Sequence, residues 1–164
     1  MAESLIPEET RAMIGELLSA PVSETISALR TQQFAHAVED LNPVYFDEEA
    51  AKAAGYRALV APPTYLNYVV AANQPVSEMR TEGLFRGGGP RIALNVKRVM
   101  FGGNEWDFLA PAYVGDTITV ETRLRGLEQK EGGSGPFVLQ TVETTYTNQE
   151  GQVVARSRGL SIAR

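Results

Sequence analysis

The chain contains no cysteine and only one histidine. Without cysteine, neither a disulfide framework nor a zinc site with thiolate ligands can form. A single histidine cannot hold zinc unless several carboxylates join it. The sequence therefore predicts no metal and no other cofactor.

The chain also lacks an excess of basic residues: it has 15 Lys and Arg against 20 Asp and Glu, a net charge of −5. This balance argues against a general nucleic-acid surface, which needs a basic face. No apolar run approaches the roughly 20 residues that span a bilayer. The first residues have neither the basic n-region nor the apolar h-region of a signal peptide. We therefore predict a cytoplasmic protein that binds neither nucleic acid nor membrane.

What is present describes a globular chain of 164 residues with 43% hydrophobic and 21% charged content. This length suits one domain, residues 1–164. Residues 1–20 form a helical extension in this interpretation, because four apolar residues over 8–18 fall on one stripe at helical spacing: Met13, Ile14, Leu17 and Leu18. Residues 22–26 are expected to be extended.

The stretch Asp40-Leu41-Asn42-Pro43-Val44-Tyr45 ends a predicted helix over 29–39, because Pro43 cannot continue a helix and disfavours the α region for Asn42. Four residues of that helix are expected to face inward: Leu29, Phe34, Ala37 and Val38. Asp47 is a good N-cap for a short helix over 48–54, and Gly55 a good C′ residue.

Residues 64–72 are apolar on nearly every side, which predicts a helix surrounded by protein. Residues 83–90 are rich in glycine and should form a loop. From residue 91 onward the hydrophobic period becomes two, first at Ile92, Leu94 and Val96 and then over 117–124. Residues 148–151 and 132–136 are expected hairpin turns. In the last strand, small residues at alternate positions from 153 to 161 are candidates for packing on helix 64–72.

Five features follow one another along the chain: helix 29–39, the Asp-x-Asn-Pro exit, the short alanine-rich helix, Gly55-Tyr56 and Ala61-Pro62-Pro63-Thr64. Their order resembles that found in the MaoC-like dehydratases. These are (R)-specific enoyl-thioester hydratases of hot-dog fold, and the N-terminal-type dehydratase domain is the best match, over 22–163. The resemblance implies an α+β hot-dog fold, a curved antiparallel sheet wrapped around helix 64–72. It also implies an acyl-CoA or acyl-ACP thioester substrate, and a homodimer or a heterodimer with another hot-dog subunit.

Hydration of a 2-enoyl thioester needs a base for the water, an acid for C2 and donors for the thioester oxygen. The resemblance makes Asp40 the candidate acid or base. The alternative from local sequence is that Asp40 only caps the following turn. Asn42 either orients Asp40 or water, or satisfies local backbone groups, and the structural role is favoured.

Tyr45 stands where fully active members of the family carry histidine. A phenol with a pKa near 10 is a poor base at neutral pH, although it can donate a hydrogen bond. The chain is therefore either a partner subunit that lacks the Asp/His pair or an enzyme in which other residues replace the histidine. His36 precedes Asp40 by four residues and could share its helical face, but a partly exposed helix histidine without a role in the site is favoured.

The remaining candidates bind substrate in this interpretation. Ala61, Thr64 and Tyr65 lie where family enzymes supply backbone N–H donors, at the start of the central helix. Arg86 and Arg91 flank a glycine run and could meet a coenzyme A phosphate, although a surface loop is the favoured reading. Trp106 and Phe108 are expected in the core or at an interface.

Three functions stay open on the sequence. The first is a 3-hydroxyacyl-thioester dehydratase or enoyl-CoA hydratase that acts in an oligomer. The second is a non-catalytic acyl-binding partner of a chain that bears Asp and His. The third is a hot-dog thioesterase, against which the Asn42-Pro43 context argues.

Overall fold

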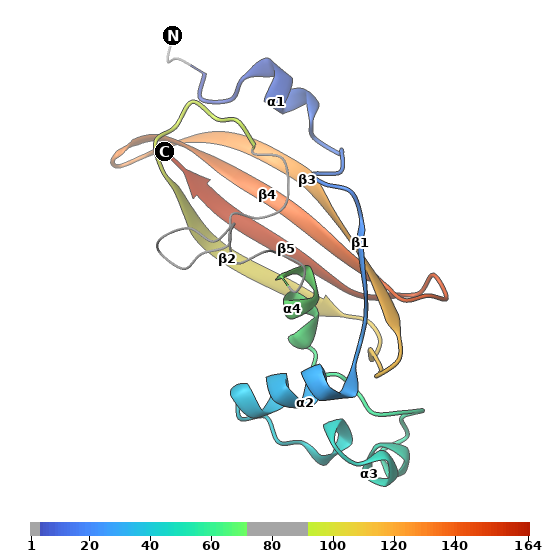
Figure 1. Ribbon diagram of the computed structural model, residues 1–164. Coiled ribbons are helices and arrows are strands. Elements are labelled where there is room, and N and C mark those ends of the chain that lie inside the picture. Colours follow the sequence, from blue (N-terminus) through green and yellow to red (C-terminus); the bar gives the residue numbers. More distant parts are fainter. Residues whose placement is uncertain (1–3, 72–91) are drawn as a thin grey trace.

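The computed structural model describes residues 4–71 and 92–164. The elements in chain order are α1 (Glu8–Ala12), β1 (Val22–Thr25), α2 (Ala28–Ala37), the 3₁₀ turn η1 (Pro43–Tyr45), α3 (Glu48–Ala53), α4 (Tyr65–Ala71), β2 (Val99–Phe108), β3 (Thr117–Gly132), β4 (Gly135–Thr147) and β5 (Val153–Ala163). The strands form one antiparallel sheet in the order β1-β3-β4-β5-β2. Helix α4 lies against the sheet, whereas α2 and α3 lie beyond one end of it (Figure 1).

The main core joins α4 to the sheet, as the sequence predicted for helix 64–72. Tyr65, Leu66 and Val69 of α4 are buried in one cluster with Ile118 and Val120 of β3 and with side chains of β4 and β5. The period-two pattern of β3 therefore points its apolar residues at the helix. In β5 the small-residue face contributes buried Ala155 to this cluster and buried Ser157 beside it.

Both predicted hairpins are confirmed. The tip of β3–β4 is a tight turn at Gly133 and Ser134, with Gly135 at φ +102°. In the β4–β5 hairpin, Asn148 Oδ1 accepts hydrogen bonds from the backbone N–H groups of Glu150 (3.1 Å) and Gln152 (2.9 Å). Gly151 takes the left-handed conformation that this turn requires, at φ +79°.

The predicted helix over 8–18 is wrong beyond Ala12. The chain turns, Gly15 adopts φ +98°, and its N–H donates to the Leu124 carbonyl at 2.7 Å. Leu18 N–H donates to Thr122 O at 2.8 Å, so residues 15–18 run beside β3. Tertiary pairing has overridden the helical stripe. Two of its residues, Leu18 and Met13, pack in a second cluster with Ile6, Leu127 and Val138, whereas Ile14 is exposed.

Two further details of the prediction are corrected. Residues 92–98 do not form a strand, although Ile92, Leu94 and Val96 do pack on the second cluster. In α2, Leu29, Ala37 and Val38 are exposed, whereas Phe34 packs on the core as expected. The reason is that α2 sits at the end of the sheet and buries only a narrow stripe, Thr31 and Ala35.

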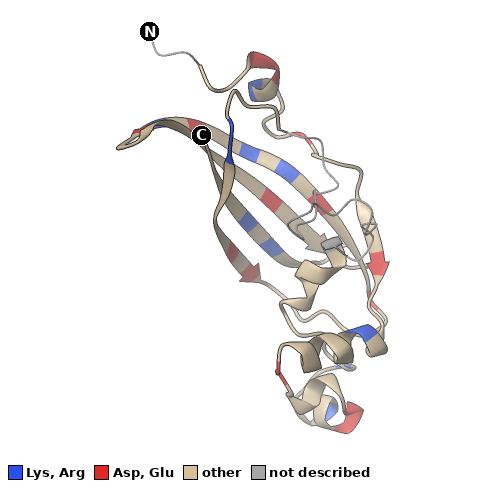
Figure 2. Cartoon of the chain, turned by 60° about the vertical axis from the view of Figure 1, so that its left-hand side comes forward, with Lys and Arg blue, Asp and Glu red and all other residues tan. Residues whose placement is uncertain are grey.

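On the face of the sheet that points away from α4, charged side chains form a cross-strand row of alternating sign. The register places Arg123 opposite Glu143, Glu143 opposite Arg158, and Arg158 opposite Glu105. Figure 2 shows basic and acidic positions side by side on neighbouring strands. Within the described ranges, no helix is long and apolar enough to cross a membrane.

Candidate functional site

The backbone at Asp40 is fixed by the way α2 ends. Glu39 takes the left-handed conformation at φ +58°, and its N–H donates to His36 O at 3.2 Å. Asp40 N–H reaches back to Ala35 O at 3.0 Å, which completes a Schellman motif. A non-glycine residue in this conformation costs about 1–2 kcal/mol. The chain therefore places the exposed Asp40 carboxylate at a defined position beyond the helix.

Asn42 has the structural role that the sequence favoured. Its Oδ1 accepts a hydrogen bond from Val44 N–H at 3.3 Å and caps η1, with Pro43 as the first residue of that turn. Asn42, and not Asp40, is therefore the residue that caps this turn. The Asp40 side chain remains available for another partner.

That partner is Tyr45. The phenol of Tyr45 donates a hydrogen bond to Asp40 Oδ2 at 3.1 Å, and its ring is buried with only 7% exposure. Burial, followed by the hydrogen bond and the charge of Asp40, raises the pKa of Tyr45 to about 12. Tyr45 is thus protonated at neutral pH and acts as a donor. His36, by contrast, is exposed and its ring lies 5.0 Å from that of Phe46.

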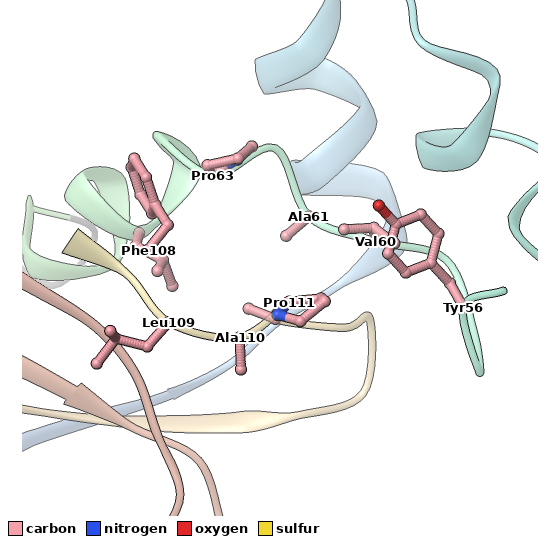
Figure 3. A pocket seen from close by; sticks show the side chains of 10 residues that line it. Tyr56, Val60, Ala61, Pro63, Phe108, Leu109, Ala110 and Pro111 are labelled. Atoms are coloured by element: carbon pink, nitrogen blue, oxygen red, sulfur yellow. The ribbon is translucent and has the colours of Figure 1, made fainter. Parts of the chain in front are cut away.

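Next to this pair lies an apolar cavity of about 280 Å³. Its walls come from two segments that face each other, and the lining residues are Tyr56, Val60, Ala61, Pro63, Leu66, Phe108, Leu109, Ala110, Pro111 and Ala112 (Figure 3). Val60 connects the cavity to the Asp40 motif, because Val60 shares a buried cluster with Tyr45 and its N–H donates to Val44 O at 3.1 Å.

The start of α4 offers fewer donors than the sequence predicted. Ala61 N–H donates to Ala112 O at 2.9 Å, so the expectation that it is free for a thioester oxygen is wrong, although Ala61 does line the cavity. Tyr65 N–H is used by Pro62 O at 2.8 Å, and Pro62 and Pro63 have no N–H. Thr64 N–H has no acceptor within residues 4–71 and 92–164.

The other predicted binding residues are not brought to the cavity. Thr64 is exposed and does not line it. The Tyr65 ring is in the core, where its hydroxyl and that of Thr31 are buried without a partner in the described part of the chain. Arg86 and Arg91 lie outside the described residues.

An ion pair between half-exposed Arg57 and buried Asp116 was missed by the sequence reasoning. Arg57 donates to Asp116 and stacks on the Tyr113 ring, 4.1 Å from its centroid. Asp116 also accepts from Gln149 Nε2 and from Tyr113 N–H, both at 3.0 Å. Burial alone would raise the pKa of Asp116, but the hydrogen bonds and the charge of Arg57 together lower it. This cluster ties residues 57, 113–116 and 149 together.

The cavity wall contributed by residues 108–112 was also missed. Phe108 was expected in the core or at an interface, yet it lines the cavity and is half exposed. Trp106 does pack on the core and stacks on Tyr146, with centroids 5.3 Å apart. The available signal was the apolar run after Phe108, Leu109-Ala110-Pro111-Ala112, which is too hydrophobic for an ordinary surface loop.

Comparison with known proteins decides the family. The family model for the FAS1-like dehydratase domain region matches residues 12–157 of this chain. The chain belongs to this family. A UPF0336 protein of Mycobacterium tuberculosis (strain H37Rv) is 30% identical over 152 residues, covering 93% of this chain and 84% of that protein. A UPF0336 protein of Streptomyces avermitilis is 34% identical over 105 residues, 63% of each chain.

Solved structures agree on the fold of this FAS1-like dehydratase domain. The ChsH1-ChsH2 complex of M. tuberculosis gives a TM-score of 0.70 at 17% identity, covering 94% of this chain and 90% of the other. The HadBC (3R-hydroxyacyl-ACP dehydratase) complex of the same organism gives a TM-score of 0.67 at 21% identity, covering 92% of this chain and 96% of the other. The (R)-hydratase from A. caviae gives a TM-score of 0.62 at 19% identity, covering 89% of this chain and 95% of the other. The hot-dog fold and the resemblance to MaoC-like dehydratases are thereby confirmed.

Proposed function

We propose that this chain is the acyl-binding subunit of a hot-dog 3-hydroxyacyl-thioester dehydratase or enoyl-thioester hydratase. In this assembly a partner hot-dog chain that bears the Asp/His pair carries out the addition or removal of water. The observation that carries the proposal is the hydrogen bond from the buried phenol of Tyr45 to Asp40.

The chemistry of that pair argues against independent catalysis. The reaction requires one group that accepts a proton from water and another that delivers a proton to C2. The Tyr45 phenol, whose pKa is about 12, cannot accept a proton at neutral pH and is a weak proton donor. Loss of one acid or base partner typically lowers the rate about 10²–10⁴-fold.

The cavity supports the binding role. A volume of about 280 Å³ with an apolar lining suits the hydrocarbon part of an acyl thioester. The family match to a dehydratase domain region and the two-subunit complexes among the structural neighbours support the same assembly. Because acyl-CoA and acyl-ACP thioesters are cytoplasmic substrates, the proposal places the chain in the cytoplasm.

A second candidate is favoured by one specific observation. The Asp40 carboxylate is exposed on a backbone held in the strained Glu39 turn, which is how a working base would be presented. In that case Asp40 takes the proton from water and Tyr45 donates one. The chain would then be a slow hydratase in its own right.

Hydration of crotonyl-CoA separates the two candidates. We expect the pure chain to be nearly silent, and Asp40→Asn to leave the rate of the complex with its co-purifying partner unchanged. If the pure chain hydrates crotonyl-CoA and Asp40→Asn lowers that rate about 10²–10⁴-fold, the second candidate is correct. Tyr45→His is the matched gain-of-function control. It should raise the hydration rate of the pure chain only if the Asp40 carboxylate already takes part in the reaction.

A further inference from the structure

The apolar cavity formed by residues 56–66 and 108–112 has one polar side chain in its wall. Of the residues that line it in the described part of the chain, Tyr56 alone carries a polar side-chain group. The others are alanines, prolines, larger aliphatic residues and Phe108. In a pocket of this kind the few polar groups fix the orientation of the ligand and provide specificity. The hydroxyl of Tyr56 is therefore the side-chain group through which the cavity can select its occupant.

The Tyr56 side chain is held in place by its surroundings. Gly55 ends α3 in the left-handed conformation, at φ +87°, and Tyr56 N–H donates to Ala51 O at 3.0 Å. The ring packs on the buried cluster that contains Val60, and it meets the Tyr113 ring edge-on with centroids 6.4 Å apart. A side chain that is already ordered loses little freedom when a ligand binds, so a hydrogen bond from it retains most of its free energy.

The hydroxyl of Tyr56 is not used by the hydrogen bonds beside it. Tyr45 donates to Asp40, and Arg57 donates to Asp116. The Tyr56 side chain is only partly buried, so water reaches it while the cavity is empty of ligand. A saturated hydrocarbon chain in the cavity would displace that water and leave the hydroxyl without a hydrogen bond. A chain that carries an oxygen atom at this point would replace the lost hydrogen bond.

The shape of the cavity determines which part of an acyl thioester reaches Tyr56. Phe108 and Leu109 lie at one end and Tyr56 at the other (Figure 3). Phe108 is 46% and Leu109 53% exposed, so this end is open, whereas Val60 beside Tyr56 is only 7% exposed. A CoA or ACP carrier does not fit into about 280 Å³ and stays outside the open end. The thioester then remains near that end, and carbon atoms of the acyl chain point toward Tyr56.

We propose that Tyr56 is a specificity-determining residue whose hydroxyl binds an oxygen atom on the acyl chain, so that the cavity selects hydroxylated over saturated acyl thioesters. A phenol both donates to and accepts from an alcohol, which suits a hydroxyl group on the chain. A hydroxyl at C3 and one at the far end of the chain present the same chemistry. This inference rests on the proposed acyl-binding function, and it adds the class of chain and the residue that recognises it.

Calorimetric titration of the purified chain with hexanoyl-CoA, 3-hydroxyhexanoyl-CoA and 6-hydroxyhexanoyl-CoA tests the proposal and distinguishes the two positions of the hydroxyl. At least one hydroxylated ligand should bind wild type about three- to tenfold more tightly than hexanoyl-CoA, as one partly exposed hydrogen bond allows. Tyr56→Phe keeps the ring and should abolish this preference, while hexanoyl-CoA binds at least as tightly as to wild type. Tyr113→Phe is the matched control, because this phenol contacts Tyr56 without lining the cavity, and it should retain the preference.

The outcomes separate this inference from the proposed function. If wild type binds all three ligands equally, or if the preference persists in Tyr56→Phe, the inference is overturned and the acyl-binding role stands. A preference lost equally in Tyr113→Phe also overturns it, because the loss would then come from the aromatic pair and not from the Tyr56 hydroxyl. If none of the three ligands binds, both the inference and the acyl-binding role fail. A pure chain that hydrates crotonyl-CoA refutes the non-catalytic role and leaves the selectivity of Tyr56 untouched.

Discussion

Two aspartates in this chain are held in opposite ways. Asp116 is 2% exposed at its side chain, accepts hydrogen bonds from Arg57, Gln149 and the Tyr113 backbone, and has its pKa lowered. Asp40 is exposed and accepts one hydrogen bond in the described structure, from a phenol. The stronger electrostatic environment therefore surrounds the aspartate outside the family motif.

The two regions have different structural roles. The Asp116 cluster links residue 57 to the turn at 113–116. The segments beside them form the cavity wall and are joined by two backbone hydrogen bonds, from Val114 N–H to Leu59 O and from Ala61 N–H to Ala112 O, both 2.9 Å long. In the Asp40 region the turn after α2 fixes the backbone, and within the described residues the carboxylate accepts a hydrogen bond only from the Tyr45 phenol. In the described structure, more hydrogen bonds therefore hold the cavity wall than hold the Asp40 carboxylate.

The largest effect is expected from removing the Asp116 carboxylate. Asp116→Ala leaves the Tyr113 N–H and the Gln149 amide without their acceptor, while half-exposed Arg57 turns to water. We expect a loss of about 2–4 kcal/mol in the free energy of unfolding, measured with urea. Asp47→Ala removes only a surface N-cap and should cost about 1 kcal/mol. Similar losses in the two variants would show that the cluster is no stronger than a cap.

The pH dependence of the free energy of unfolding at acidic pH is a second test of the difference between Asp116 and Asp40. Because the folded pKa of Asp116 lies below its unfolded value, the carboxylate stabilises the fold above that unfolded value. This contribution is lost as the pH falls from the unfolded pKa through the lowered folded pKa. Urea titrations at a series of acidic pH values should therefore show a shallower dependence for Asp116→Asn than for wild type. A pH dependence as steep in Asp116→Asn as in wild type would contradict this prediction.

The next effect concerns the cavity. Ala110→Leu adds three carbon atoms to its wall and should shorten the acyl chain that it accepts. We expect the affinity for a medium-chain acyl-CoA to fall at least about tenfold, because each methylene in an apolar pocket contributes about 1–3 kcal/mol. Crotonyl-CoA binding should change little. Ala54→Leu, on an exposed position after α3, is the matched control. Unchanged medium-chain affinity by calorimetry would place the acyl chain elsewhere.

Local physical signals explain what could be predicted from the sequence. The Asp47 cap, the Gly55 end of α3 and the Asn148 turn depend on residues within a few positions of each other. Long-range features could not be predicted, because Arg57 and Asp116 are 59 positions apart and nothing in either neighbourhood reveals the other. The β-bulge at Gly102 in β2 could not be predicted for a related reason. It is defined by a shift between Phe101 and Gly103 in the pairing with β5, which the local sequence does not specify.

A smaller effect is expected at alkaline pH from Tyr45. Its folded pKa of about 12 lies above the ordinary tyrosine value of 10.0, so the phenol stabilises the fold below pH 10. This contribution is lost as the pH rises through the folded pKa. Tyr45→Phe should remove one late step from the spectrophotometric tyrosine titration. Tyr146, whose pKa burial also raises to about 12, supplies a second late step that must persist. A titration unchanged in Tyr45→Phe would mean that the phenol is not bound to Asp40.

The smallest effect is a gain in stability at Glu39. Its left-handed backbone, φ +58°, is one that glycine adopts without steric cost, whereas glycine loses more entropy on folding. Glu39→Gly should therefore stabilise the chain by about 0.5–1 kcal/mol in urea unfolding. Ala37→Gly, two residues earlier within α2, should instead destabilise it by about 1 kcal/mol. Opposite signs at these neighbouring positions would show that the turn before Asp40 is held against its own backbone preference. If Glu39→Gly also destabilises, the carboxylate of Asp40 is not presented by a strained turn, and the main observation in favour of independent catalysis is lost.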